Sequence, residues 1–270
     1  MNPLKYWTLD EFEISSYKYS LNLRVNKRHH TSGSDNTGNC QYTYNELGFR
    51  GDSPNMNGFK IMSIGCSLTE GVGVNDNQTW PSKFSKMVLN GVDLNFGCGG
   101  RSNDYISRCL LSYYDYVKPD LVLIMYTFLN RREIYTEGNQ IEPFMVGSSW
   151  GYLEEQEDGT TIQNNLTEIQ NRNEDIVNWY KNHLLITQFL KLRNCNFIWN
   201  GSLDVPTDIN DEYRFDGDYK NFLDLGVDGG HPGPKHNKNY SKKLFDYIDN
   251  NFPNFIFKKN NDDVTIKKMI

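Results

Sequence analysis

Short apolar runs alternate with segments of helical periodicity along the chain, and this alternation constrains the fold more than any other feature. Four runs bounded by loop-forming residues predict buried strands, at Lys60–Ile64, Leu94–Phe96, Leu121–Tyr126 and Asn196–Trp199. Helical spacing of apolar residues follows each run, at Pro81–Leu89, Asp104–Val117, Asn173–Leu192 and about Asn239–Asn250. Because the strands are apolar on both faces, we expect an α/β fold, a three-layer α/β/α sandwich with a mostly parallel central sheet.

Polar segments flank and interrupt this alternation. Residues 1–58 are expected to form an N-terminal extension packed on one domain that covers residues 59–252, followed by a C-terminal tail at residues 253–270. The segment Asn45–Gly51 predicts a structured turn before the first strand. A long polar insertion at about residues 131–172 is of the kind that serves as a lid or a binding surface in compact domains.

The composition is unusual because the 270 residues include no alanine. Hydrophobic residues make up 37% of the chain and aromatic residues 14%, so a few large side chains must supply the apolar volume of the core. Where helices approach the sheet closely, Gly, Ser and Cys have to take the small positions. This gives Cys98 and Cys109 an expected structural role.

Charge and spacing of residues exclude several classes of function. A net charge of -6 without a long basic run argues against nucleic acid as a partner. No run approaches the length of a membrane span, and the N-terminus lacks the apolar stretch of a signal peptide, so we expect a cytoplasmic protein, virion-associated if its source is viral. Cysteine and histidine spacings predict neither a disulfide framework nor a metal site, and no cofactor is expected. The oligomeric state is not predicted.

In a parallel sheet, ligands bind beyond the carboxyl ends of the strands, and the loop after the first strand there reads Gly65-Cys66-Ser67-Leu68-Thr69-Glu70-Gly71. Two interpretations of this loop are open. Ser67 can stand at the strand-to-helix turn with its hydroxyl exposed and its amide free, or Ser67 and Glu70 can form a capping box with no further purpose.

The loops after the next two strands carry groups that can stabilise an oxyanion. The second strand ends in a glycine-rich segment, and a glycine such as Gly100 beside the serine lets a substrate oxygen approach a backbone amide. Alternatively this segment is only a tight turn with Asn103 as a helix cap. The third strand is followed by Asn130, whose amide side chain is expected in the same row.

Near the C-terminus, Asp228 and His231 lie three positions apart in a loop rich in glycine and proline, just before the last helix. A carboxylate that orients an imidazole, with that imidazole facing a serine, is the arrangement of nucleophile, base and orienting group in serine catalysis. Considered alone, such a pair is more often composed of ordinary loop residues.

The order of these segments resembles the SGNH/GDSL hydrolase family over about residues 45–252: Gly-x-Ser-Leu-Thr, then Asn-x-Gly-x-x-Gly, then Asn, then Asp-x-x-His before the last helix. The resemblance implies a flavodoxin-like fold and hydrolysis of an ester, best guessed as a small acyl ester on a carbohydrate. Carried over by position, it implies a Ser67 nucleophile, His231 as base and acid, Asp228 as its orienting group, and oxyanion donors at Ser67, Gly100 and Asn130.

The sequence departs from the family pattern at two points. Cys66 stands where the family usually has Asp, which leaves the nucleophile intact. In the third block the expected Asn position falls on Leu129, so either a one-residue bulge brings Asn130 into the site or the side-chain donor is lost. Two alternatives therefore stay open beside hydrolysis: a catalytically weak or inactive carbohydrate-binding or assembly module, and an acyltransferase using the same acyl-enzyme.

Overall fold

A computed structural model describes residues 28–32, 39–135, 141–145, 172–201, 211–217 and 221–255. Its centre is a five-stranded sheet, in which all strands are parallel except the short β3, which pairs antiparallel with β5. The order across the sheet is β3 (Arg50–Gly51), β5 (Gly91–Gly97), β4 (Phe59–Gly65), β6 (Leu121–Tyr126) and β9 (Asn196–Gly201). The four strands predicted from the sequence are therefore all present and parallel.

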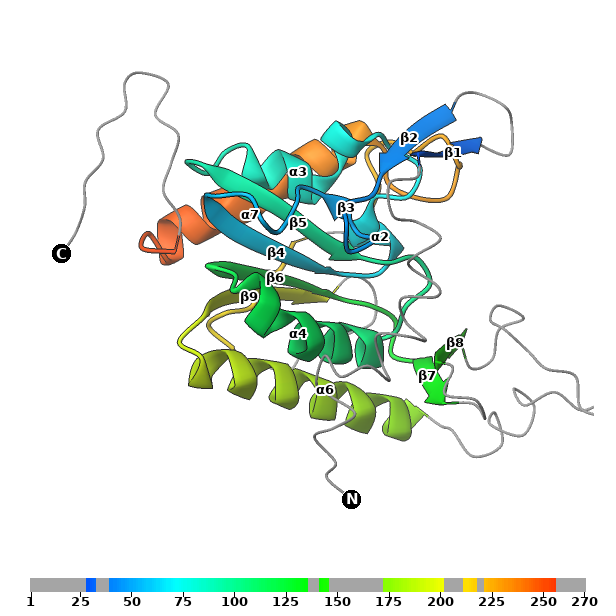
Figure 1. Ribbon diagram of the computed structural model, residues 1–270. Helices are drawn as coiled ribbons and strands as arrows, with labels where there is room; N and C mark the ends of the chain where they lie inside the picture. Colours follow the sequence, from blue (N-terminus) through cyan, green and yellow to red (C-terminus); the bar gives the residue numbers. More distant parts are fainter. Residues whose placement is uncertain are drawn as a thin grey trace, which may run out of the picture.

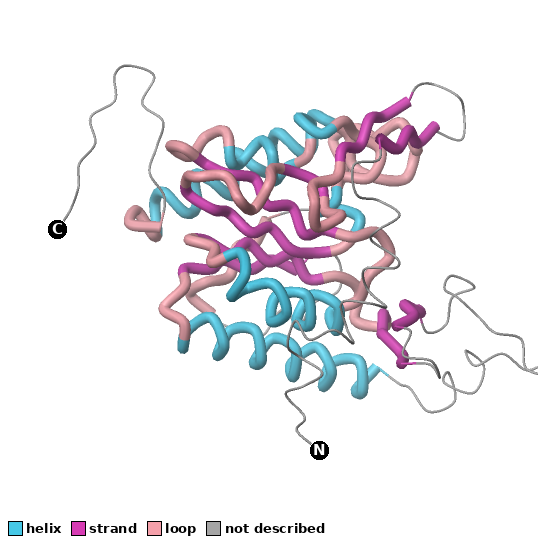
Figure 2. The backbone as a smooth tube through the Cα atoms, in the orientation of Figure 1, coloured by secondary structure: helices cyan, strands magenta, loops and turns pink. Residues whose placement is uncertain are grey.

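Helices cover both faces of this sheet, which makes the fold the expected three-layer α/β/α sandwich (Figures 1 and 2). One layer consists of α4 (Asn103–Val117) and α6 (Arg172–Leu192), and the other of α3 (Trp80–Ser85) and α7 (Pro234–Asn251). The core has a half on each side of the sheet. Tyr105, Ile106 and Trp179 are buried on the α4 and α6 side, and Trp80, Phe84 and Leu244 on the α3 and α7 side.

Two helix boundaries differ from the prediction. Helix α3 begins where Trp80-Pro81 indicated but ends at Ser85 rather than Leu89, because the next amides bond back three residues and Asn90 has a φ of 53°. Helix α7 begins at Pro234, five residues before the predicted start. Proline fits the first helical turn, where its missing N–H has no intrahelical acceptor in any case.

Small residues occupy the places where helices and loops meet the sheet. Cys98 and Cys109 are both buried in the core, as the absence of alanine predicted. Glycine is required at the close contacts: a Cβ atom on Gly65 would lie 2.2 Å from Thr69 Oγ1, and one on Gly97 would lie 2.1 Å from the Glu70 nitrogen. These two glycines let the chain after β4 pack directly on β5.

Two hairpins flank the sandwich. Strands β1 (Arg28–Ser32) and β2 (Asn39–Thr43) pair antiparallel, and the segment after β2 continues into β3, so the region before residue 59 contributes an edge strand to the central sheet. Strands β7 (Arg131–Tyr135) and β8 (Ile141–Met145) pair antiparallel at the start of the predicted insertion. Residues 136–140, 146–171 and 256–270 lie outside the described part. None of the described helices combines the length and the hydropathy needed to span a bilayer.

Candidate active site

Ser67 is the first residue of the one-turn helix α2 (Ser67–Glu70), which begins just beyond the carboxyl end of β4. Because it is the first helical residue, its amide has no acceptor within the helix. The capping-box interpretation is wrong. Cys66 is the N-cap residue and no side chain caps the helix, since the Glu70 carboxylate is bonded elsewhere. Cys66 itself is buried in the α3 and α7 half of the core, which favours Ser67 over Cys66 as a nucleophile.

The glycine-rich turn after β5 lies beside Ser67. The amide of Gly99 donates a 2.6 Å hydrogen bond to Glu70 Oε2, and a Cβ atom on Gly99 would lie 3.9 Å from Ser67 Cβ. Gly100 has a φ of 76°, which a residue with a side chain rarely adopts. Asn95 links β5 to α2, because its Nδ2 donates to the Thr69 carbonyl at 2.9 Å. The turn and the helix are therefore fixed to each other.

Asn103 does not cap helix α4. The N-cap is Ser102, whose hydroxyl accepts a hydrogen bond from the Tyr105 amide. Asn103 is instead the first helical residue, and its side chain bridges to the loop after β6: Oδ1 accepts from the Thr127 amide at 2.9 Å, and Nδ2 donates to the Thr127 carbonyl at 3.3 Å. Asn103 thus pins the loop that leads to Asn130.

Asp228 and His231 contact each other as the sequence predicted. An Asp228 carboxylate oxygen is hydrogen-bonded to His231 Nδ1, and the other accepts the His231 amide at 3.3 Å. Their exposed side-chain fractions are 20% and 28%, so the imidazole is reachable from solvent. The loop is braced by Asp224, whose carboxylate accepts the amides of Lys235 and His236 at the start of α7. Because a carboxylate only accepts hydrogen bonds, the contact with Asp228 favours the His231 tautomer that carries its proton on Nδ1. The Nε2 atom of His231 is then able to accept a proton.

The Asp228 loop lies against the loop that follows α2. The Val227 amide donates to the Gly73 carbonyl at 2.9 Å, and a Cβ atom on Gly73 would lie 2.3 Å from Asp228 Oδ1. Ser67, Gly100 and the Asp228–His231 pair are thus gathered at one corner of the sheet. The Ser67 hydroxyl and His231 are not hydrogen-bonded to each other in the described structure, and such bonds often form only when substrate is present.

The third predicted oxyanion donor stays a prediction. Leu129, at the position where the family pattern has Asn, is 3% exposed and packs in the α4 and α6 half of the core. Asn130 follows it on a turn and is half-buried. The Leu129 side chain therefore cannot replace the amide, and Asn130 is the candidate that remains.

Sequence reasoning missed the charged residue that holds this corner together. Arg50 is 1% exposed, and its guanidinium donates to the carbonyls of Glu70 (2.9 Å), Gly71 (2.7 Å) and Val74 (3.0 Å) and to Asp76 Oδ1 (2.9 Å). Its other face lies over the Tyr42 ring, 4.0 Å from the centroid. The Tyr42 hydroxyl in turn accepts the Gly73 amide at 2.7 Å. Arg50 lies in the segment Asn45–Gly51, which was predicted as a structured turn with no role assigned to this residue.

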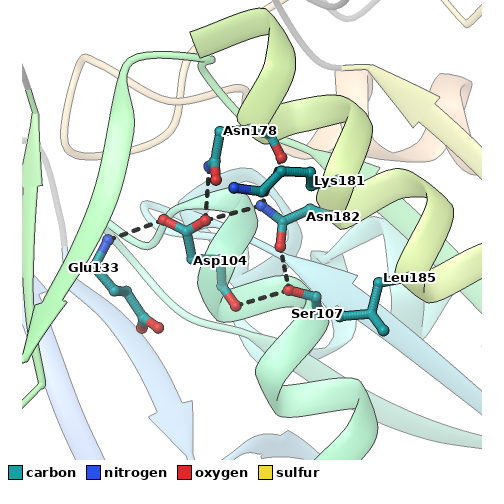
Figure 3. A pocket seen from close by; sticks show the side chains of 7 residues that line it. All are labelled: Asp104, Ser107, Glu133, Asn178, Lys181, Asn182 and Leu185. Carbon is teal, nitrogen blue, oxygen red and sulfur yellow. Dashed lines mark hydrogen bonds between the residues drawn. The ribbon is translucent and has the colours of Figure 1, made fainter. Parts of the chain in front are cut away.

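A separate pocket lies between α4 and α6 and has a volume of about 290 Å3 (Figure 3). Asp104 is at its centre and accepts hydrogen bonds from Asn178 (2.7 Å), Asn182 (2.8 Å) and the Glu133 amide (3.1 Å). The Ser107 hydroxyl binds Asn182 Oδ1. The side chains of Asp104, Ser107, Asn178 and Asn182 thus bind one another, and none of the predicted site residues lines this pocket.

Comparison with known proteins gives structural neighbours and no match in sequence. No family model matches the chain, and no curated protein does. A carbohydrate esterase family 2 enzyme with a carbohydrate-binding domain from Corynascus thermopiles (Myceliophthora fergusii) is 12% identical, with a TM-score of 0.45 over 72% of this chain and 66% of that chain. Carbohydrate esterases and a protein described as lipolytic are among the solved neighbours.

Two further neighbours match this chain over almost their whole length. A protein of the G-D-S-L family from Desulfitobacterium hafniense DCB-2, described as lipolytic, is 12% identical with a TM-score of 0.40, over 70% of this chain and 99% of that one. A carbohydrate acetylesterase family member from Sinorhizobium meliloti is 13% identical with a TM-score of 0.31, over 72% and 99%. With identities and TM-scores this low, these likenesses carry no conclusion about this chain.

Proposed function

We propose that this protein is a serine hydrolase that cleaves an ester through Ser67, His231 and Asp228. The observation that carries the proposal is the contact between Asp228 and His231 in a loop that packs on the loop after the Ser67 helix. A serine at a helix start, an oriented imidazole and a glycine turn at one sheet corner supply a nucleophile, a base and an oxyanion donor.

The reaction uses the chain's own groups. Ser67 Oγ attacks the acyl carbon while His231 Nε2 accepts the hydroxyl proton, and Asp228 stabilises the resulting imidazolium. The amides of Ser67 and Gly100, with Asn130 as the third predicted donor, bind the oxyanion of the tetrahedral intermediate. His231 then protonates the leaving alcohol, and the acyl-enzyme remains. Water attacks it, with His231 again as base, and releases the acid and free Ser67.

The substrate class that we propose is a small acyl ester, such as an acetyl group, on a carbohydrate or a similarly polar molecule. Supporting this is the insertion at about residues 131–172, which is polar and carries aromatic residues of the kind that stack on sugar rings. Its hairpin of β7 and β8 starts from the loop that contains Asn130.

Labelling with a fluorophosphonate, followed by intact-mass measurement, tests the nucleophile. We expect one adduct per wild-type chain and none on Ser67→Ala, with Cys66→Ala as the matched control that still labels. No adduct on folded wild type would exclude the mechanism.

A binding or assembly module is the second candidate, and the burial of Leu129 at the expected Asn position favours it. Loss of one oxyanion donor lowers kcat by about 10²- to 10³-fold, so this candidate predicts labelling without appreciable turnover.

An acyltransferase is distinguished by adding an acceptor alcohol to the assay: acyl transfer then outpaces release of the free acid. Hydrolysis as the function predicts that added alcohol leaves most of the product as acid.

A further inference from the structure

We propose that Glu70 is a positioning residue of this site, and that it holds the Gly99–Gly100 turn in register with Ser67. The proposal rests on the proposed function, because it assigns a role in oxyanion binding. Glu70 is 3% exposed, and both carboxylate oxygens have donors: Oε2 accepts the Gly99 amide at 2.6 Å, and Oε1 accepts the Tyr44 hydroxyl at 3.1 Å.

The position of Glu70 in the chain gives this contact its meaning. Ser67 and Glu70 are the first and last residues of the same helical turn, so one rigid piece of backbone carries the nucleophile and the carboxylate. The amide that Glu70 binds belongs to Gly99, the residue directly before Gly100. The Gly99 amide lies in the peptide plane directly before the one that carries the Gly100 amide, so this bond anchors the start of the turn and leaves only the φ and ψ of Gly99 between the anchor and the donor. The nucleophile and the oxyanion donor are thereby held at a set distance from each other.

A carboxylate suits this task better than a neutral acceptor. It only accepts hydrogen bonds, and bonds to an ionised acceptor are shorter and about twice as strong as bonds between neutral groups. Burying the charge is costly unless donors satisfy it, which the Gly99 amide and the Tyr44 hydroxyl do. Arg50 adds support by donating to the Glu70 carbonyl at 2.9 Å. Glu70 thus joins the N-terminal segment, the nucleophile helix and the glycine turn.

The test compares Glu70→Ala and Glu70→Gln with wild type, using nitrophenyl acetate turnover divided by the number of sites that a fluorophosphonate titrates. Because unfolded protein does not react with the fluorophosphonate, kcat per titrated site refers to folded protein only. We expect Glu70→Ala to lower kcat per site about 10- to 100-fold with KM within about twofold, a fraction of the full loss of an oxyanion donor. Glu70→Gln keeps an acceptor oxygen and should lower kcat by only about threefold. The matched control is Asp104→Asn, at a hydrogen-bonded carboxylate between α4 and α6, which should leave kcat per site unchanged.

A kcat per site within twofold of wild type in Glu70→Ala overturns the proposal, as does an equal loss in the Ala and Gln variants. If Glu70→Ala does not fold, Glu70→Gln decides: unchanged kcat overturns the proposal. Hydrogen exchange of the Gly99 amide in wild type gives a readout without catalysis, with slow exchange expected and fast exchange contradicting the contact. If wild type is neither labelled nor active, both the proposed function and the role of Glu70 are wrong. If wild type is active and the Glu70 variants match it, only the role of Glu70 is wrong.

Discussion

Two polar networks on this molecule use their side chains in opposite ways. At the Ser67 corner, Arg50 and Glu70 bind backbone carbonyls and amides of the surrounding loops. Between α4 and α6, Asp104 and Asn182 bind mainly other side chains and join one helix to the next. The first network fixes loops whose own groups stay available to a substrate. The second consumes its polar groups internally.

The difference separates a hollow with charged walls from the corner that holds the proposed catalytic pair. The pocket around Asp104 has the volume for a small ligand, yet Asp104, Ser107, Asn178 and Asn182 are already hydrogen-bonded to one another (Figure 3). The Asp228–His231 pair has an imidazole whose second nitrogen makes no hydrogen bond within the described residues. Perturbing equivalent residues in the two networks should therefore separate activity from stability.

The largest effect is expected from exchanging a carboxylate for an amide in each network. Asp228→Asn should lower kcat about 10³- to 10⁴-fold, because the amide favours the wrong tautomer of His231 and cannot stabilise its imidazolium. Asp104→Asn should leave kcat per titrated site unchanged and cost about 1 to 3 kcal/mol of unfolding free energy, since an NH₂ group would face the donors of Asn178 and Asn182.

Nitrophenyl acetate turnover and urea unfolding measure the two quantities on the same samples. The distinction between the two networks is wrong if Asp104→Asn reduces kcat per site as much as Asp228→Asn does. It is also wrong if Asp228→Asn keeps wild-type turnover, because His231 would then not depend on its orienting partner.

The next effect concerns two of the buried arginines, Arg50 and Arg108. Arg50→Met strands the Glu70, Gly71 and Val74 carbonyls, and Arg108→Met leaves Glu133 as an unpaired buried charge. Each should lower the free energy of unfolding by about 3 to 5 kcal/mol. Only Arg50→Met should also reduce kcat per titrated site. The control is Arg193→Met, whose exposed ion pair with Asp115 should contribute less than about 1 kcal/mol. Equal turnover in the two buried-arginine variants would show that Arg50 serves stability alone.

The sequence predicted the layers of this fold well because the apolar pattern records burial directly. The strand at Leu121–Tyr126 was predicted at its observed bounds, since all six residues are buried on both faces of a central strand. Boundaries set by local hydrogen bonds were less predictable. The early start of α7 depends on Asp224, ten residues before Pro234, and no periodicity encodes that contact.

The candidate site was predicted in part for a similar reason. Asp228 and His231 are close in sequence, so their contact follows from a short loop. Glu70 was assigned to the wrong partner because its actual one, the Gly99 amide, is 29 positions away and meets it only through the pairing of β4 with β5. Arg50 was missed because a buried guanidinium that binds carbonyls leaves no signature in spacing.

A smaller effect, specific to pH, contrasts Asp93 with the satisfied Asp104. Asp93 is buried on β5, its Oδ1 has no hydrogen-bond partner within the described residues, and burial raises its pKa to about 8. The folded protein therefore binds a proton that the unfolded chain releases near pH 4, so stability is lost as pH rises from about 4 to 8. Asp93→Asn stays neutral, so its free energy of unfolding should gain on that of wild type as pH rises from about 4 to 8, with the difference shrinking toward pH 4.

Urea unfolding at several pH values measures this difference, and Asp115→Asn on the exposed face of α4 serves as control. A gap between Asp93→Asn and wild type that does not change with pH would contradict the titration. A gap that grows as pH falls would have the opposite sign and would mean that Asp93 is ionised in the fold.

The smallest effect is expected at Lys181, an exposed residue on α6 that lines the pocket around Asp104. Lys181→Met keeps the aliphatic stem and removes the charge, so stability should change by less than about 0.5 kcal/mol. If the substrate binds at the Ser67 corner, the kcat/KM for an acylated sugar should stay within about twofold of wild type. A tenfold rise in KM would instead place sugar binding between α4 and α6. The network between α4 and α6 would then take part in substrate recognition, and the distinction between a reactive and a structural network would be wrong.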